Sequence, residues 1–313
     1  MQNSKNFSKG AGIGIAIGIF AVVIVLMIFV CFPLQYRLGM TGLFLTELIF
    51  LAVSLLVCLI FRQKFSEVFK ISRPKLRHVF GTLILWAGMI LITSCVAMIT
   101  LVLFPRFQQT ASGLTDFISK TPAILTVIIV AVMPAICEEA LHRGVILHFF
   151  GKIKSTWLIV LIMGIIFGIF HLDPYRFLIT ALLGGAITYI AVKTHNILLC
   201  ALFHFVNNLP AAITSAFAQN ITSNELTDLN MMLINPGSRM IEVGGVMLLT
   251  SVAPLLLLAG SVLLSEKDDI KKGLNVKIAV FVSLSALMII VGIWLIVIGF
   301  LISARVFLPR LIY

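Results

Sequence analysis

Long apolar segments, separated by short polar or basic connections, dominate the chain. A membrane-spanning helix needs about 20 apolar residues, and stretches of about that length recur from end to end. We expect helices at 11–32, 38–61, 79–104, 121–150, 155–172, 176–193, 196–217, 240–264 and 277–303. The pattern predicts an all-α polytopic membrane protein, a helical bundle of eight or nine transmembrane helices.

Composition supports this prediction. Of the 313 residues, 60% are hydrophobic and only 11% are charged, whereas average proteins have about 25% charged residues. The net charge of +11 raises the question of a nucleic-acid partner. Because Lys and Arg gather in the cytoplasmic loops of membrane proteins, we attribute the charge to topology and expect no nucleic acid. The same bias predicts a cytoplasmic N-terminus, and the residue usage favours a bacterial cell membrane.

The chain divides into three parts. Residues 1–120 are expected to form N-terminal transmembrane helices with a basic amphipathic cytoplasmic segment near 61–80. Residues 121–217 carry most of the intramembrane polar groups, and residues 218–313 hold an outer loop and the C-terminal helices. In the first helix Gly10, Gly14 and Gly18 repeat every four residues, which predicts a close-packing face, either within the chain or between two copies of it.

Several ionisable or strongly polar residues fall inside the predicted spans: Glu47, Glu138, Glu139, His142, Arg143, His148, His171, His204, Asn207, Asn208 and, near a helix end, Glu242. A charged side chain at a helix centre costs about 2.5–3.5 kcal/mol on insertion. Glu139 and Arg143 lie four residues apart, so they share a helix face and can form an ion pair. Glu138 is rotated by about 100° from that face and stays free.

Other polar residues have a spacing that places them beside this carboxylate. Pro134 cannot donate a hydrogen bond to the carbonyl of Val130, so the helix is expected to open there. His171 follows a stripe of small residues, and His204 and Asn208 share one face of a later helix. From the helix rise, these groups lie at compatible depths. A cavity shared by three helices is therefore predicted.

The chemistry of this set suits hydrolysis of a peptide bond. Glu138 can act as a general base toward a water molecule held by His171, while His204 and Asn208 stabilise the oxyanion. Alternatively, Glu138, His171 and His204 can bind Zn²⁺, since two His and one Glu are a known catalytic zinc set. The sequence leaves open whether the cofactor is Zn²⁺ or none.

Three motifs together resemble a known family. Glu138-Glu139-xxx-Arg143, Phe167-xxx-His171 and His204-xxx-Asn208 stand in this order on successive helices, as in the CPBP (CAAX protease and bacteriocin-processing, or Abi) intramembrane proteases, also called type II CAAX prenyl endopeptidases. The resemblance implies a four-helix catalytic core at 121–217 that opens toward the cytoplasm. It implies catalytic roles for Glu138, His171, His204 and Asn208, and supporting roles for Glu139 and Arg143.

The resemblance also implies a membrane-embedded or lipidated peptide or protein as substrate, without saying whether it is prenylated. Family members have been described both as metalloproteases and as glutamate-type proteases. Two other function classes stay open: a proton-coupled transporter, and a non-catalytic immunity or scaffold protein on the same fold. A di-iron site built on Glu139 and His142 lacks a second copy of its motif, and a nucleophilic thiol at Cys200 lies in apolar surroundings that favour inertness. The oligomeric state is not predicted.

Overall fold

The computed structural model describes residues 7–104, 106–107, 121–217, 235–266 and 274–307. In these residues all regular secondary structure is helical, and eight helices are long and apolar enough to cross a membrane. The prediction of an all-α polytopic membrane protein is confirmed.

The N-terminal third forms three long rods and one short helix. The first rod is α1 (Lys9–Leu26), a π-helical turn (Met27–Cys31) and α2 (Phe32–Leu38), and then come α3 (Met40–Ile60), α4 (Phe65–Val68) and α5 (Leu76–Leu103). Gly39 has φ +56° and turns the chain between α2 and α3, a backbone conformation that glycine adopts without a steric penalty.

The central part contains one long interrupted rod and three further helices. The rod is α7 (Ala123–Thr126), a π-helical turn (Val127–Val132), α8 (Met133–Glu139), a second π-helical turn (Ala140–Ile146) and α9 (Leu147–Phe149). It is followed by α10 (Thr156–Phe170), α11 (Phe177–Thr194) and α12 (Ile197–Phe217). The C-terminal helices are α14 (Pro236–Leu249), α15 (Ala253–Leu264) and α17 (Leu274–Phe307).

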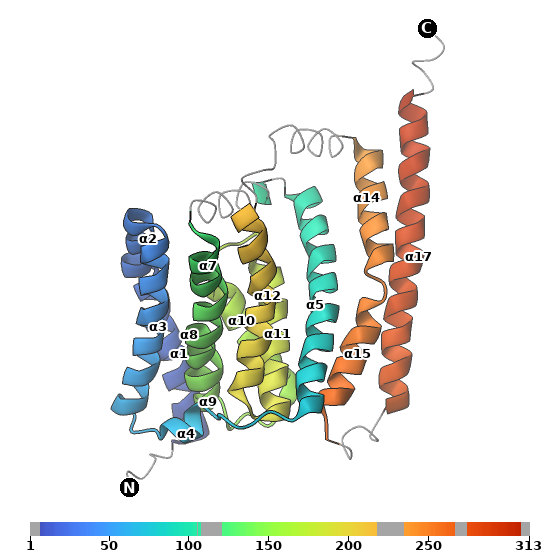
Figure 1. Cartoon of the computed structure of the whole chain (residues 1–313). Helices are drawn as coiled ribbons and strands as arrows, with labels where there is room; N and C mark the ends of the chain where they lie inside the picture. The colour runs from blue at the N-terminus through green and yellow to red at the C-terminus, as the bar shows by residue number, and fades with distance from the viewer. Residues whose placement is uncertain (1–6, 105, 108–120, 218–234, 267–273, 308–313) are drawn as a thin grey trace.

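The helices stand side by side in one bundle (Figure 1). The rod α7–α9 lies between α3 and α12, α10 and α11 lie behind the rod and α12, and α5 separates this core from α14, α15 and α17. The helix α1 begins at the end of the bundle that holds α4, and α17 ends at the opposite end (Figure 1). The chain reaches opposite ends of the bundle when it crosses an odd number of times. The eight long helices and the shorter α10 together give such a number in the described residues.

One predicted span is shorter than expected. The segment 155–172 forms α10, which has 15 residues and is therefore about 22 Å long, less than the hydrocarbon thickness of about 30 Å. The helix ends because Leu172 adopts φ +51°, a conformation that no helix continues through. The chain after Phe170 thus turns within the depth of the bundle, which brings His171 to a helix end instead of a helix face.

The expected glycine face of the first helix is wrong within this chain. A side-chain carbon added at Gly10, Gly14 or Gly18 would meet nothing within 4 Å. The packed face instead carries Gly12, where an added carbon would lie 2.6 Å from the carbonyl oxygen of Phe149. The repeat of four residues was real, but the helix is rotated so that another face meets its neighbours.

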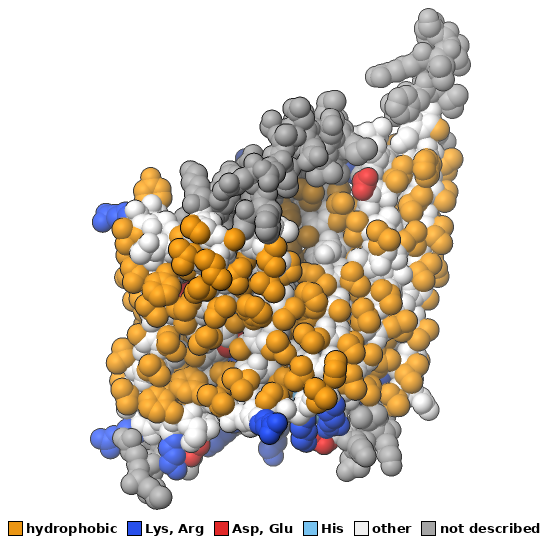
Figure 2. All heavy atoms as spheres, viewed as in Figure 1, with side chains coloured by type: hydrophobic (Ala, Val, Ile, Leu, Met, Phe, Trp, Pro, Cys, Tyr) orange, Lys and Arg blue, Asp and Glu red, His pale blue; other side chains and the backbone are white. Residues whose placement is uncertain are grey.

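Basic residues gather at one end of the bundle. Figure 2 shows a broad hydrophobic band over the helices, with Lys and Arg side chains along its lower edge. The predicted amphipathic segment 61–80 lies at this end, but only Phe65–Val68 and the residues from Leu76 onward are helical. Between them the chain is extended and is held by two hydrogen bonds, from the Ile197 backbone N–H to the Lys70 carbonyl (3.1 Å) and from the Asn196 side chain to the Ser72 carbonyl (2.8 Å).

Candidate active site

The first motif forms a buried ion pair. Arg143 Nη1 donates to Glu139 Oε1 at 2.9 Å, and both side chains are only 1% exposed. The other guanidinium nitrogen, Nη2, donates to the Gly184 carbonyl at 2.7 Å. The pair predicted from the four-residue spacing is therefore present, and Arg143 also ties α11 to the central rod.

The third motif meets the first through its histidine. His204 Nδ1 lies 2.7 Å from Glu139 Oε1, the oxygen that also accepts from Arg143. The family resemblance implies a supporting role for Glu139, and the motif spacing predicts His204 with Asn208 at an oxyanion. In the structure Glu139 holds His204 directly, so one carboxylate joins α8 to α12, and its partner Arg143 extends the contact to α11.

The aromatic ring of Phe167 lies at the centre of the site. The Arg143 guanidinium carbon lies 4.6 Å from its centroid. Three imidazoles contact it in edge-to-face geometry, with centroid distances of 5.0, 4.8 and 5.9 Å for His142, His171 and His204. Gly184 permits this position, because a carbon added there would lie 2.5 Å from the Phe167 Cβ.

The hydrogen bonds fix which nitrogen of each imidazole carries a proton. His142 Nδ1 contacts the Glu138 carbonyl at 2.9 Å, and His171 Nδ1 contacts the Phe167 carbonyl at 2.8 Å. A carbonyl oxygen only accepts, so both Nδ1 atoms donate and both neutral rings present Nε2 as an acceptor. His204 follows the same pattern with a carboxylate as its acceptor. His204 can donate from Nε2 only when both its nitrogens are protonated.

Glu138 is the carboxylate without an assigned partner. It is buried, and its Oε2 has no hydrogen-bond partner within the described residues. The ionisable side chains that lie close enough to act on it electrostatically include His204, Glu139 and Arg143. A buried carboxylate oxygen that lacks a partner in a polar cluster is suited to bind water or substrate.

Asn208 has a role that sequence reasoning missed. Its Nδ2 donates to the Val130 carbonyl at 3.1 Å. Residue 134 is proline and has no N–H, so it cannot make the usual helical hydrogen bond to that carbonyl. Asn208 therefore replaces a bond that the sequence itself removes. Its second amide hydrogen stays available, while its Oδ1 accepts from Asn207 at 3.2 Å.

Two further residues lie near the site. Arg176 acts electrostatically on both Glu138 and His171, and the turn after α10 brings it there. Glu47 on α3 is 2% exposed, its Oε2 has no partner in the described chain, and the charge of Glu138 acts on it. Glu47 was expected to be important because it is an ionisable residue inside a predicted membrane span, but no sequence motif connected it to the site.

The zinc set inferred from the sequence fits only in part. His171 and His204 each direct Nδ1 to a carbonyl or carboxylate, as metal-binding histidines do. However, among the described residues no three His, Cys, Asp or Glu side chains are grouped closely enough to hold a metal ion. The arrangement of Glu138, His171 and His204 is thus not a formed metal site, and no catalytic step below is assigned to a metal.

A pocket leads from the basic end of the bundle toward this site. Its volume is about 540 Å³, and its lining includes Arg143 and Gly144 at depth and Lys70 and Lys154 near the surface. The motif arginine is therefore reached from the end that carries the Lys and Arg residues.

Comparison with protein families identifies the central part of the chain. Residues 120–210 match the family model described as type II CAAX prenyl endopeptidase Rce1-like. This range includes all three motifs, from Glu138 to Asn208. Comparisons with curated proteins and with solved structures found no match. The resemblance inferred from the motifs is confirmed for this range.

Proposed function

We propose that this multi-pass membrane protein, whose residues 120–210 match a CAAX-type protease family model, is an intramembrane endopeptidase with Glu138 as its general base. The observation that carries the proposal is that two adjacent carboxylates differ in their hydrogen-bond partners. Both carboxylates keep one buried oxygen, Oε2, without a partner in the described residues. Only Glu139 is held through its other oxygen by Arg143 and His204, so we assign the proton transfer to Glu138.

In the proposed mechanism Glu138 and His171 Nε2 accept the two hydrogens of one water molecule. Glu138 removes a proton as the water oxygen attacks the carbonyl carbon of the scissile peptide. The oxyanion that forms accepts hydrogen bonds from the remaining Asn208 amide hydrogen and from doubly protonated His204, which Glu139 holds. Glu138 then returns its proton to the leaving nitrogen, and the carbonyl reforms as the C–N bond breaks.

The substrate is proposed to be a membrane-associated or lipidated peptide or protein, since the site lies inside the bundle. We place the basic end in the cytoplasm, following the bias of Lys and Arg. The pocket that reaches Arg143 from this end supports access from the cytoplasmic side.

The test is cleavage of candidate membrane peptides by the full chain in proteoliposomes. Glu138→Gln should lower kcat by at least about 100-fold, the usual scale for a lost general base. Glu242→Gln, the same change on α14, should leave it unaltered. His171→Ala should lower it as well. Cleavage that survives in Glu138→Gln would overturn the mechanism, and loss of cleavage with a chelator, restored by Zn²⁺, would favour the metal version. Uptake of a solute without cleavage would favour a transporter.

A further inference from the structure

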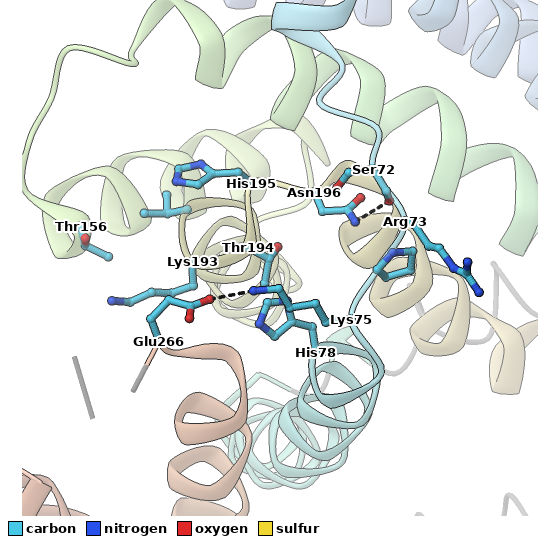
Figure 3. Close-up of a pocket in the computed structure, with 12 residues that line it drawn as sticks. Ser72, Arg73, Lys75, His78, Thr156, Lys193, Thr194, His195, Asn196 and Glu266 are labelled. Atoms are coloured by element: carbon cyan, nitrogen blue, oxygen red, sulfur yellow. Dashed lines mark hydrogen bonds and ion pairs between the residues drawn. The ribbon is translucent and has the colours of Figure 1, made fainter. Parts of the chain in front are cut away.

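A separate pocket opens at the basic end of the bundle. Its volume is about 380 Å³. It is bounded by the chain before α5, the α11–α12 turn and the end of α15 (Figure 3). Arg73, Lys75 and Lys193 contribute positive charge to its lining, and Glu266 contributes one negative charge. No motif residue lines it.

His78 brings a polar atom without a partner into this pocket. It lies in the first turn of α5, is 5% exposed, and its Nε2 has no hydrogen-bond partner within the described chain. A buried polar group left without a partner costs about 1–3 kcal/mol. The pocket is therefore incomplete as it stands, and a ligand with acceptor oxygens would complete it.

The carboxylate of Glu266 already forms ion pairs with two basic side chains near the pocket. Glu266 Oε1 lies 3.2 Å from Lys75 Nζ and 2.9 Å from Arg77 Nη2. The Lys75 hydrogen bond, followed by the charge of Arg77, lowers the pKa of Glu266, so this carboxylate is ionised at neutral pH. The Glu266 side chain is 62% exposed, so another anion can displace it at small cost.

The surroundings place the pocket at the level of lipid headgroups. The hydrophobic band over the helices ends here (Figure 2). Next to the lining residue Thr156, the exposed ring of Trp157 stacks on Tyr189 with a centroid distance of 5.7 Å. Trp and Tyr concentrate where a membrane meets water. On the other side Leu76 and Phe80 of α5 are exposed, as expected of residues that contact acyl chains.

We propose that this pocket binds a phosphate-bearing anion, and that the headgroup of an acidic phospholipid supplies it. The Arg73 side chain points away from Glu266 and Lys193 (Figure 3), so it contributes positive charge at the edge of the pocket. Lys75 adds a point charge, and His78 donates from Nε2 in the tautomer that carries its proton there. The site lies outside the proposed protease centre and does not depend on its activity.

The source of the phosphate is tested with three probes on the purified full chain in neutral detergent. These are dihexanoyl phosphatidylglycerol, dihexanoyl phosphatidylcholine and inorganic phosphate, titrated by calorimetry and by thermal shift. Saturable binding of phosphatidylglycerol, with weaker binding of the other two, is the expected result. Equal affinity for inorganic phosphate would show that a free anion is the ligand and would overturn the lipid assignment. Equal affinity for phosphatidylcholine would overturn the anion site.

Charge-matched variants separate the pocket from general surface charge. Lys75→Gln should weaken phosphatidylglycerol binding by about 5-fold, and Glu266→Gln should strengthen it by a similar factor, each corresponding to about 1 kcal/mol. The controls are Lys64→Gln and Glu67→Gln, because Lys64 and Glu67 form a comparable exposed ion pair at 3.3 Å. Equal effects in both sets would mean diffuse surface charge and would refute the site.

His78→Phe tests the buried nitrogen. Phenylalanine keeps the ring and removes Nε2, which has no partner in the described chain. We expect an unchanged or higher unfolding temperature without lipid, together with weaker phosphatidylglycerol binding. Unchanged binding in a folded His78→Phe would remove His78 from the site and contradict the proposal.

Discussion

Replacing Arg143 by methionine tests the most deeply buried charge pair of the bundle. Arg143 donates to Glu139 at 2.9 Å and to the Gly184 carbonyl at 2.7 Å, and its guanidinium lies 4.6 Å from the Phe167 ring. Methionine has a similar length and is apolar, so it leaves no large cavity. Its main effect is to leave the Glu139 carboxylate with His204 as its only hydrogen-bond partner in the described residues.

The magnitude follows from the burial of both partners. Breaking a buried ion pair by removing one partner costs about 3–5 kcal/mol, because the other charge stays buried. Loss of the guanidinium–ring contact adds about 1 kcal/mol, and the remaining His204 contact offsets part of the sum. We therefore expect a loss of about 3 kcal/mol, which corresponds to roughly 5 °C in the unfolding temperature of a chain of 313 residues.

The assay is thermal unfolding of the detergent-solubilised chain, with Arg37→Met, at an exposed position, as the matched control. Adding Glu139→Gln to Arg143→Met removes the unpaired charge, so the double variant should recover at least about 1 kcal/mol. The reasoning fails if Arg143→Met melts at the temperature of Arg37→Met. It also fails if the second substitution lowers stability further.

Two more predictions use contacts at the same site. Gly184→Ala should displace Phe167, since the added carbon would lie 2.5 Å from its Cβ. Cleavage should then fall by about 10-fold or more. The control is Gly185→Ala, whose added carbon would lie 3.5 Å from its nearest neighbour and should not alter cleavage. Asn208→Ala should destabilise the chain by about 1 kcal/mol, and Pro134→Ala, which restores a helical N–H, should reduce that cost. Equal cost in both backgrounds, measured by thermal unfolding, would show that Asn208 does not replace the missing bond.

The helices and the local pairs could be predicted because each depends on spacing along one segment. About 20 apolar residues suffice to span a membrane, so most helix positions followed from the sequence with errors of a few residues at their ends. The helix expected at 240–264 is an exception, because it is broken between Leu249 and Ala253 into α14 and α15. The same holds for the Glu139–Arg143 pair, since residues four apart always share a helix face.

The contacts between helices could not be predicted, because they depend on how each helix is rotated about its axis. The bond between His204 and Glu139 joins residues 65 positions apart, and no periodicity encodes it. The glycine repeat of the first helix failed for the same reason, because spacing identified a face but not its partner. The end of α10 at Phe170 depends on the backbone of Leu172, which an apolar run does not indicate.

The second motif acquires a physical meaning that its spacing alone does not convey. The carbonyl of Phe167 accepts a hydrogen bond from Nδ1 of His171. The four-residue spacing therefore places the proton of the neutral ring on Nδ1 and leaves Nε2 as an acceptor. The ring of the same residue contacts Arg143 and the edges of three imidazoles, so it fills the space between the held carboxylate and His171. A smaller apolar residue would keep the backbone bond but lose these ring contacts. The backbone carbonyl of Phe167 thus sets the proton position on His171, and its aromatic ring sets the packing of the side chains around the held carboxylate.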